Sequence, residues 1–143
     1  MVADSVLLVD DEVEFVETLA ERMRARGLDV TTAHDGADAL RKAEDQTFHA
    51  IVLDLAMPGM DGIETLRRLR AKDPDRQIIL LTGQGSVPSA VEATQLGAMD
   101  YLEKPAQIDV LLDRIRKARA RWLGANQKRA EEEISHILSR RGW

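Results

Sequence analysis

The sequence of 143 residues contains no cysteine, which excludes disulfide bonds, a thiol nucleophile and a cysteine-based zinc site. Aromatic residues make up only 3% of it, too few for a platform on which nucleic-acid bases could stack. The net charge of -5 also argues against non-specific nucleic-acid binding. No apolar run approaches the roughly 20 residues of a membrane-spanning helix, and residues 1–4 lack the basic and apolar build of a signal peptide. We therefore expect a cytoplasmic protein without direct nucleic-acid or membrane contact.

Short apolar runs alternate five times with amphipathic segments of helical spacing. The run at 51–53 shows no apolar/polar alternation, which is typical of a strand buried on both faces of a parallel sheet. The expected strands are 5–9, 28–32, 50–53, 77–81 and 98–102, and the expected helices are 13–26, 37–46, 62–72, 86–97 and 108–122. This alternation predicts one α/β domain, a doubly wound parallel sheet with helices on both faces.

Chemically active side chains follow four of the expected strands: Asp10 and Asp11, Asp54, Thr82, and Lys104. In a doubly wound sheet the carboxyl ends of the strands converge on one crevice. Three carboxylates repel one another unless a cation neutralises them, and oxygen ligands without His or Cys suit Mg²⁺. Asp54 could then attack phosphorus and form an acyl phosphate, while Lys104 and Thr82 bind the phosphoryl oxygens. Taken alone, each of these residues could also have a purely structural role, as a helix cap, a turn residue or a surface lysine.

Four segments carry a resemblance to the receiver domains of bacterial two-component response regulators. They are Leu7 to Glu12, Asp54 to Gly62, Thr82-Gly83, and Tyr101 to Pro105. The resemblance covers about residues 4–122. It implies a flavodoxin-like, five-stranded parallel sheet of order 2-1-3-4-5.

The resemblance also assigns a role to each site residue. The Mg²⁺ ligands would be Asp10, Asp11, Asp54 and the backbone carbonyl of Ala56. The phosphoacceptor would be Asp54, with Thr82 and Lys104 binding the phosphoryl group and Tyr101 changing rotamer with Thr82. The peptide bond before Pro105 would be cis.

By the same resemblance, the chain is a signalling switch that catalyses only its own phosphorylation and dephosphorylation. The phosphoryl donor would be a sensor histidine kinase or a histidine phosphotransfer protein. Phosphorylation would change the surface of the fourth helix, fifth strand and fifth helix, and so alter partner binding or homodimer formation.

Two other classes remain open from the residues alone. A Mg²⁺-dependent phosphohydrolase with an Asp nucleophile usually has a second Asp two residues later, where this chain has Ala56. A flavodoxin-like nucleotide or flavin binder would need a phosphate loop rich in Gly, Ser or Thr after the first strand, where Asp10, Asp11 and Glu12 stand.

The sequence divides into a receiver domain at 4–122 and a C-terminal amphipathic helical extension or linker at 123–143. We expect a break at 123–126, followed by a helix whose apolar residues are Ala130, Ile134, Ile137 and Leu138. This segment could dock on the domain, pair with a second copy of itself or begin a linker. The chain would be either a single-domain regulator or a receiver fragment of a DNA-binding transcription regulator.

Overall fold

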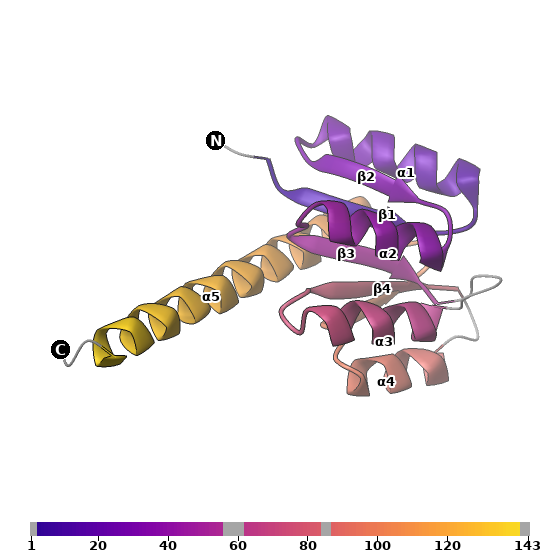
Figure 1. The fold of residues 1–143 in the computed structure, drawn as a ribbon. Helices are drawn as coiled ribbons and strands as arrows, with labels where there is room; N and C mark the ends of the chain where they lie inside the picture. Colours follow the sequence, from indigo (N-terminus) through magenta and orange to yellow (C-terminus); the bar gives the residue numbers. More distant parts are fainter. Residues whose placement is uncertain (1–2, 56–61, 84–86, 141–143) are drawn as a thin grey trace.

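The computed structural model describes residues 3–55, 62–83 and 87–140, in which strands and helices alternate along the chain (Figure 1). The elements in chain order are β1 (Ser5–Val9), α1 (Val13–Ala25), β2 (Asp29–Ala33), α2 (Gly36–Asp45), β3 (Ala50–Asp54), α3 (Gly62–Lys72), β4 (Ile78–Thr82), α4 (Val87–Gln95), β5 (Asp100–Glu103) and α5 (Ile108–Arg140). The predicted alternation of five strands and five helices is confirmed.

The five strands form one parallel sheet in the order β2-β1-β3-β4-β5, as predicted. β3 lies at the centre, and all five of its residues are buried. Its unbroken apolar run follows from this position, because helices cover both faces of the strand and leave no side exposed to water.

Two apolar layers flank the sheet. On one face, α2, α3 and α4 pack side chains such as Ala39, Leu66 and Ala93 against the strands. On the other face, α1 and α5 contribute residues such as Val16 and Ile115. The expected doubly wound arrangement is therefore present.

Most predicted boundaries differ from the structure by one or two residues. The third helix, 62–72, agrees in full. Gly27 follows the end of α1 with a φ of 90°, a left-handed conformation that glycine adopts without steric cost. The strands β2, β4 and β5 begin one or two residues later than predicted, because pairing with neighbouring strands sets their limits and a single segment carries no pairing information.

The predicted break at 123–126 is wrong. α5 continues through these residues as one helix of 33 residues, and its second half runs away from the sheet (Figure 1). Gly124 lies within this segment, but glycine inside a helix costs only about 1 kcal/mol relative to alanine. Tertiary contacts on both sides of Gly124 can offset a cost of this size.

These contacts fix α5 to the amino-terminal edge of the sheet. The Trp122 ring meets the His49 ring edge-on, with 4.9 Å between ring centroids. Within α5 itself, the Asn126 side chain donates a hydrogen bond to the Trp122 carbonyl over 2.9 Å. Arg129 then forms ion pairs with Asp73 and Asp75, in the connection between α3 and β4. The part of α5 that follows residue 122 thus contacts the domain. The predicted domain boundary at residue 122 stays a prediction.

Candidate functional site

The register of the sheet brings two acidic residues side by side. Val9 of β1 pairs with Leu53 of β3, so Asp10, which directly follows β1, and Asp54, the last residue of β3, are neighbours at the carboxyl edge of the sheet. Both carboxylates are buried, with exposed fractions of 1% for Asp10 and 4% for Asp54. Burying two carboxylates is unfavourable unless positive charges or hydrogen bonds compensate them.

The backbone around β1 fixes Asp10. Its N–H donates to the carbonyl of Ala33 over 3.1 Å, which continues the pairing with β2 by one residue. Its Oδ1 accepts a hydrogen bond from the backbone N–H of Glu12 over 3.0 Å. The second oxygen, Oδ2, remains directed toward the crevice, where it meets Lys104.

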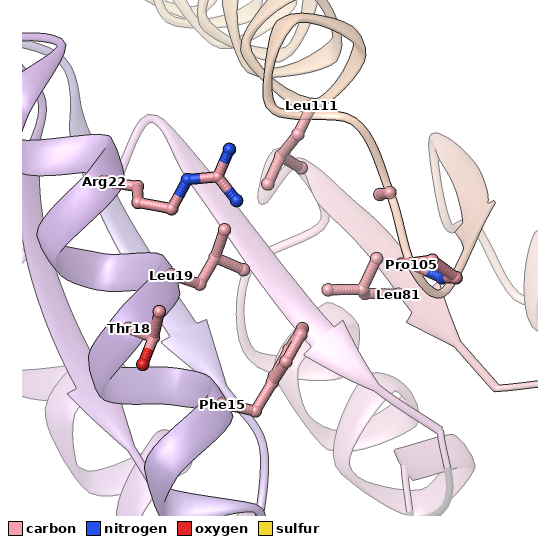
Figure 2. A pocket seen from close by; sticks show the side chains of 8 residues that line it. Phe15, Thr18, Leu19, Arg22, Leu81, Pro105 and Leu111 are labelled. Carbon is pink, nitrogen blue, oxygen red and sulfur yellow. The ribbon is translucent and has the colours of Figure 1, made fainter.

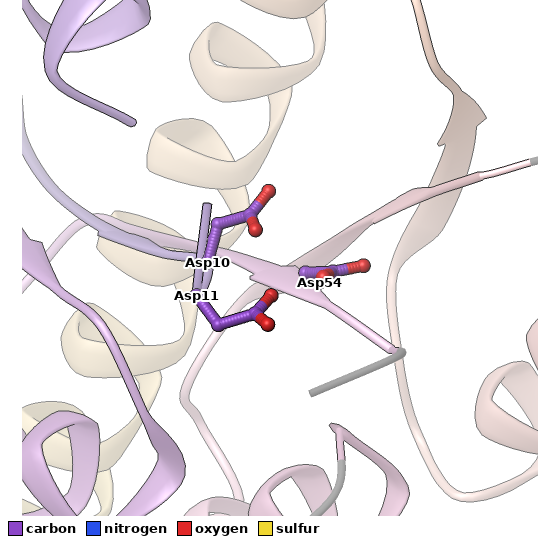
Figure 3. Close-up of side chains that lie close together, drawn as sticks. All are labelled: Asp10, Asp11 and Asp54. Atoms are coloured by element: carbon purple, nitrogen blue, oxygen red, sulfur yellow. The ribbon is translucent and has the colours of Figure 1, made fainter. Parts of the chain in front are cut away.

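Three carboxylates converge at this edge of the sheet, as predicted. Asp10, Asp11 and Asp54 each place one carboxylate oxygen within 4.8 Å of the oxygens of the other two (Figure 3). The donor set is hard oxygen throughout, which Mg²⁺ prefers and which suits zinc or copper less well. The residues therefore fit a magnesium ion, and such an ion would relieve the repulsion between the three charges.

Lys104 supplies a positive charge from the connection between β5 and α5. Its Nζ lies 2.6 Å from Asp10 Oδ2 and 3.9 Å from Asp54 Oδ2. Burial of this ammonium group lowers its pKa. The hydrogen bond to Asp10 and the charges of the nearby carboxylates outweigh burial, so the pKa of Lys104 is raised above its ordinary value of 10.5. Lys104 is thus held as a cation against the acidic cluster.

The remaining predicted residues are placed as follows. Thr82 is the last residue of β4 and pairs with Glu103, directly before Lys104. Tyr101 lies on β5, half-buried, and packs against the apolar layer of α2, α3 and α4. The Lys104–Pro105 peptide bond is cis. Ala56, the expected source of a carbonyl ligand, lies outside the described residues.

Two residues of the site had no assigned role in the sequence analysis. Glu12 Oε1 lies 3.6 Å from the Lys104 Nζ, and the Phe15 ring lies beneath the same nitrogen, 4.6 Å from it to the ring centroid. Both residues follow the acidic pair within about one helical turn. Their closeness in sequence to Asp10 and Asp11 could have marked them as site residues. Only the folded structure shows that Lys104 contacts them.

A small cavity adjoins the site between α1, β4 and the start of α5 (Figure 2). Its volume is about 160 Å³, and its lining is largely apolar. The residues that line it are Phe15, Thr18, Leu19, Arg22, Leu81, Pro105, Ala106 and Leu111. Phe15 thus belongs both to the cavity wall and to the surroundings of Lys104.

Comparison with known proteins agrees with this geometry. The family described as response regulator receiver domain matches residues 6–116. The chain is 40% identical over 130 residues to the transcriptional regulatory protein PrrA of Mycobacterium leprae, a match that covers 91% of this chain and 55% of PrrA. It is 44% identical over 114 residues to the C4-dicarboxylate transport transcriptional regulatory protein DctD of Pseudomonas aeruginosa, with 79% of this chain and 24% of DctD covered.

A solved structure supports the same assignment. A response regulator receiver domain protein from Clostridium thermocellum superposes with a TM-score of 0.80 at 28% identity, covering 82% of this chain and 95% of that one. The chain spans about half the length, or less, of the curated relatives named above. Within its described residues, no helix is both long and apolar enough to cross a membrane.

Proposed function

Because the chain belongs to the response regulator receiver domain family, we propose that it is a phosphorylation-operated switch with Asp54 as the phosphoacceptor. The observation that carries this proposal is the meeting of three carboxylates and one ammonium group at a single edge of the sheet. Burying Asp54 next to Asp10 and a lysine costs desolvation energy. This cost favours a functional reason for the arrangement over a purely structural one.

In the proposed reaction an Asp54 carboxylate oxygen attacks the phosphorus of the donor. The new oxygen–phosphorus bond forms as the bond to the donor breaks, and the electron pair of that bond leaves with the donor. For a phosphohistidine donor the leaving atom is an imidazole nitrogen. Lys104 and Thr82 would bind oxygens of the transferred group. The Lys104 ammonium would balance its negative charge, and the Thr82 hydroxyl would help to orient it.

The fit of the acidic cluster to Mg²⁺ belongs to the same proposal. Asp10, Asp11 and Asp54 would hold the ion, together with the backbone carbonyl of Ala56. When bound, Mg²⁺ would neutralise the charge that otherwise repels an incoming phosphoryl group. Asp10 is already fixed for this task by the backbone N–H of Glu12.

We further propose that the donor is a sensor histidine kinase or a histidine phosphotransfer protein in the cytoplasm. An aspartyl phosphate adds negative charge at the end of β3, which can shift the population of a two-state surface. The proposed surface is formed by α4, β5 and α5, with Thr82 and Tyr101 as the residues that link it to the site. The output would be a changed affinity for a partner or for a second copy, through this surface or the second half of α5.

The names of the relatives favour one specific setting. PrrA and DctD are called transcriptional regulatory proteins, and both are longer than this chain. In this version of the proposal, residues 4–122 act as the receiver of a DNA-binding regulator and residues 123–143 lead from it. A second domain would then bind DNA, and the receiver would control it.

Intact mass spectrometry after incubation with Mg²⁺ and acetyl phosphate tests the proposal. We expect a phosphoryl adduct on the wild type and on Asp45→Asn, a control that changes an exposed carboxylate at the end of α2. We expect none on Asp54→Asn. An equal adduct on Asp54→Asn would contradict the choice of Asp54, and its absence from a wild type that binds Mg²⁺ would contradict the switch altogether. Size-exclusion chromatography of the same samples shows whether phosphorylation changes the oligomeric state.

A further inference from the structure

The ammonium group of Lys104 has unlike surroundings on its two sides. Asp10, Glu12 and Asp54 place carboxylate oxygens 2.6, 3.6 and 3.9 Å from Nζ. The face of the Phe15 ring lies 4.6 Å from the same atom. The lysine side chain is only 17% exposed, so little water competes with these neighbours.

A cation over an aromatic face is attracted by the negative charge density of the ring, and the attraction increases when water is excluded. The carboxylates alone would leave the flexible four-carbon chain of Lys104 free to reach them in several rotamers. The ring restricts that freedom, because only a rotamer that places Nζ over the Phe15 ring satisfies both contacts. A leucine at this position would fill similar space but offer no such attraction.

The position of the Phe15 ring is set by α1. The helix begins at Val13, immediately after the acidic residues, so Phe15 lies in its first turn. Figure 2 shows the Phe15 side chain extending from α1 toward Leu81 of β4. Packing against the apolar layer of α1 and α5 holds the ring in place.

We propose that Phe15 is a positioning residue for the phosphoryl transfer, whose ring holds the Lys104 ammonium group beside Asp10 and Asp54 before the donor arrives. This inference rests on the proposed function, since it assigns Phe15 a part in the same reaction. Phe15 acts through Lys104 and touches no reacting atom. Its removal therefore slows the transfer without changing which residue accepts the phosphoryl group.

Three variants separate this role from simple packing. Phe15→Leu keeps an apolar side chain but loses the aromatic face, and Phe15→Tyr keeps the face. Thr18→Val is the control, because Thr18 lines the same cavity as Phe15 and its substitution leaves the Phe15 ring unchanged. The donor is acetyl phosphate, a small molecule that needs no protein docking on the cavity, so an effect on partner binding cannot imitate the result.

We expect Phe15→Leu to lower the rate of adduct formation on Asp54 by about twofold to tenfold, the range of a partly desolvated cation–π contact. Phe15→Tyr and Thr18→Val should react like the wild type. Nuclear magnetic resonance of the Lys104 ε-methylene protons gives a second reading. Their signal should be shifted upfield by the ring in the wild type and in Phe15→Tyr, and should return toward that of an exposed lysine in Phe15→Leu.

The inference is overturned if Phe15→Leu reacts at the wild-type rate, or if Phe15→Tyr is as slow as Phe15→Leu. It is also overturned if the ε-methylene signal is the same in wild type and Phe15→Leu. A wild type without any adduct would instead overturn the proposed function. The ring-dependent signal would in that case still support the placement of Lys104 by Phe15.

Discussion

Replacing Lys104 by methionine tests the electrostatics of the site most directly. Methionine keeps most of the length and volume of the side chain but removes the charge. The substitution leaves Asp10 and Asp54 buried without the ammonium group that lies 2.6 and 3.9 Å from their oxygens. Glu12, at 3.6 Å, is 66% exposed and contributes less, because water screens exposed pairs.

The expected cost follows from the burial of Asp10. Removing one partner of a buried ion pair typically destabilises a protein by about 3–5 kcal/mol, because the other charge stays buried and uncompensated. The lower end applies here, since Asp10 keeps the hydrogen bond from the backbone N–H of Glu12. We expect Lys104→Met to lower the free energy of unfolding by about 3 kcal/mol in the absence of Mg²⁺.

Urea unfolding followed by circular dichroism measures this effect. With an m-value of about 2 kcal/mol/M, the midpoint should fall by about 1.5 M. Lys117→Met is the matched control, because Lys117 pairs with Asp113 on the exposed side of α5 and should cost less than about 0.5 kcal/mol. Under the proposed function Mg²⁺ would bind the acidic cluster of the folded protein, and it should then stabilise Lys104→Met more than the wild type.

Equal midpoints for Lys104→Met and Lys117→Met would refute the reasoning, because the ion pair with Asp10 would then contribute nothing. Failure of Mg²⁺ to stabilise either protein would refute the assignment of the acidic cluster as a cation site.

Three further predictions follow from contacts in the structure. Folding raises the pKa of Lys104, so the positive charge of Lys104 contributes fully to stability below pH 10.5, and this contribution is lost as the pH rises through the folded-state value. The difference in the free energy of unfolding between wild type and Lys104→Met should therefore be smaller at about pH 11 than at about pH 8 in urea titrations. In thermal unfolding, Gly62→Ala should destabilise the protein by about 3 kcal/mol, because a Cβ there would lie 2.5 Å from the backbone oxygen of Asp54. Gly124→Ala should instead stabilise α5 by about 0.5–1 kcal/mol, because a Cβ at this position meets open space. Trp122→Ala should cost about 2 kcal/mol in urea unfolding through the lost contact with the domain, and Leu123→Ala, a neighbour that is 43% exposed, should cost less than half of that.

The sequence by itself determined the alternation of strands and helices, because that information is local. Each strand is a short apolar run, and each helix has an apolar face at helical spacing. The unalternating run in β3 also required a strand buried on both sides, and parallel strands require the crossover connections that the helices supply. The convergence of Asp10, Asp11, Asp54 and Lys104 was predictable for the same reason, since each follows a strand of one parallel sheet.

The tertiary structure alone decided how these residues meet and that the last helix continues past Gly124. Lys104 and Asp10 are separated by 94 positions, and their pairing over 2.6 Å depends on the register of the four strands β1, β3, β4 and β5. The ring of Phe15 beneath Lys104 depends on how α1 packs on the sheet. α5 continues through Gly124, and the residues on either side of it, Trp122 and Arg129, contact His49, Asp73 and Asp75, which are distant in the sequence. Local patterns specify which elements form, whereas contacts between distant residues specify their limits and the geometry of the site.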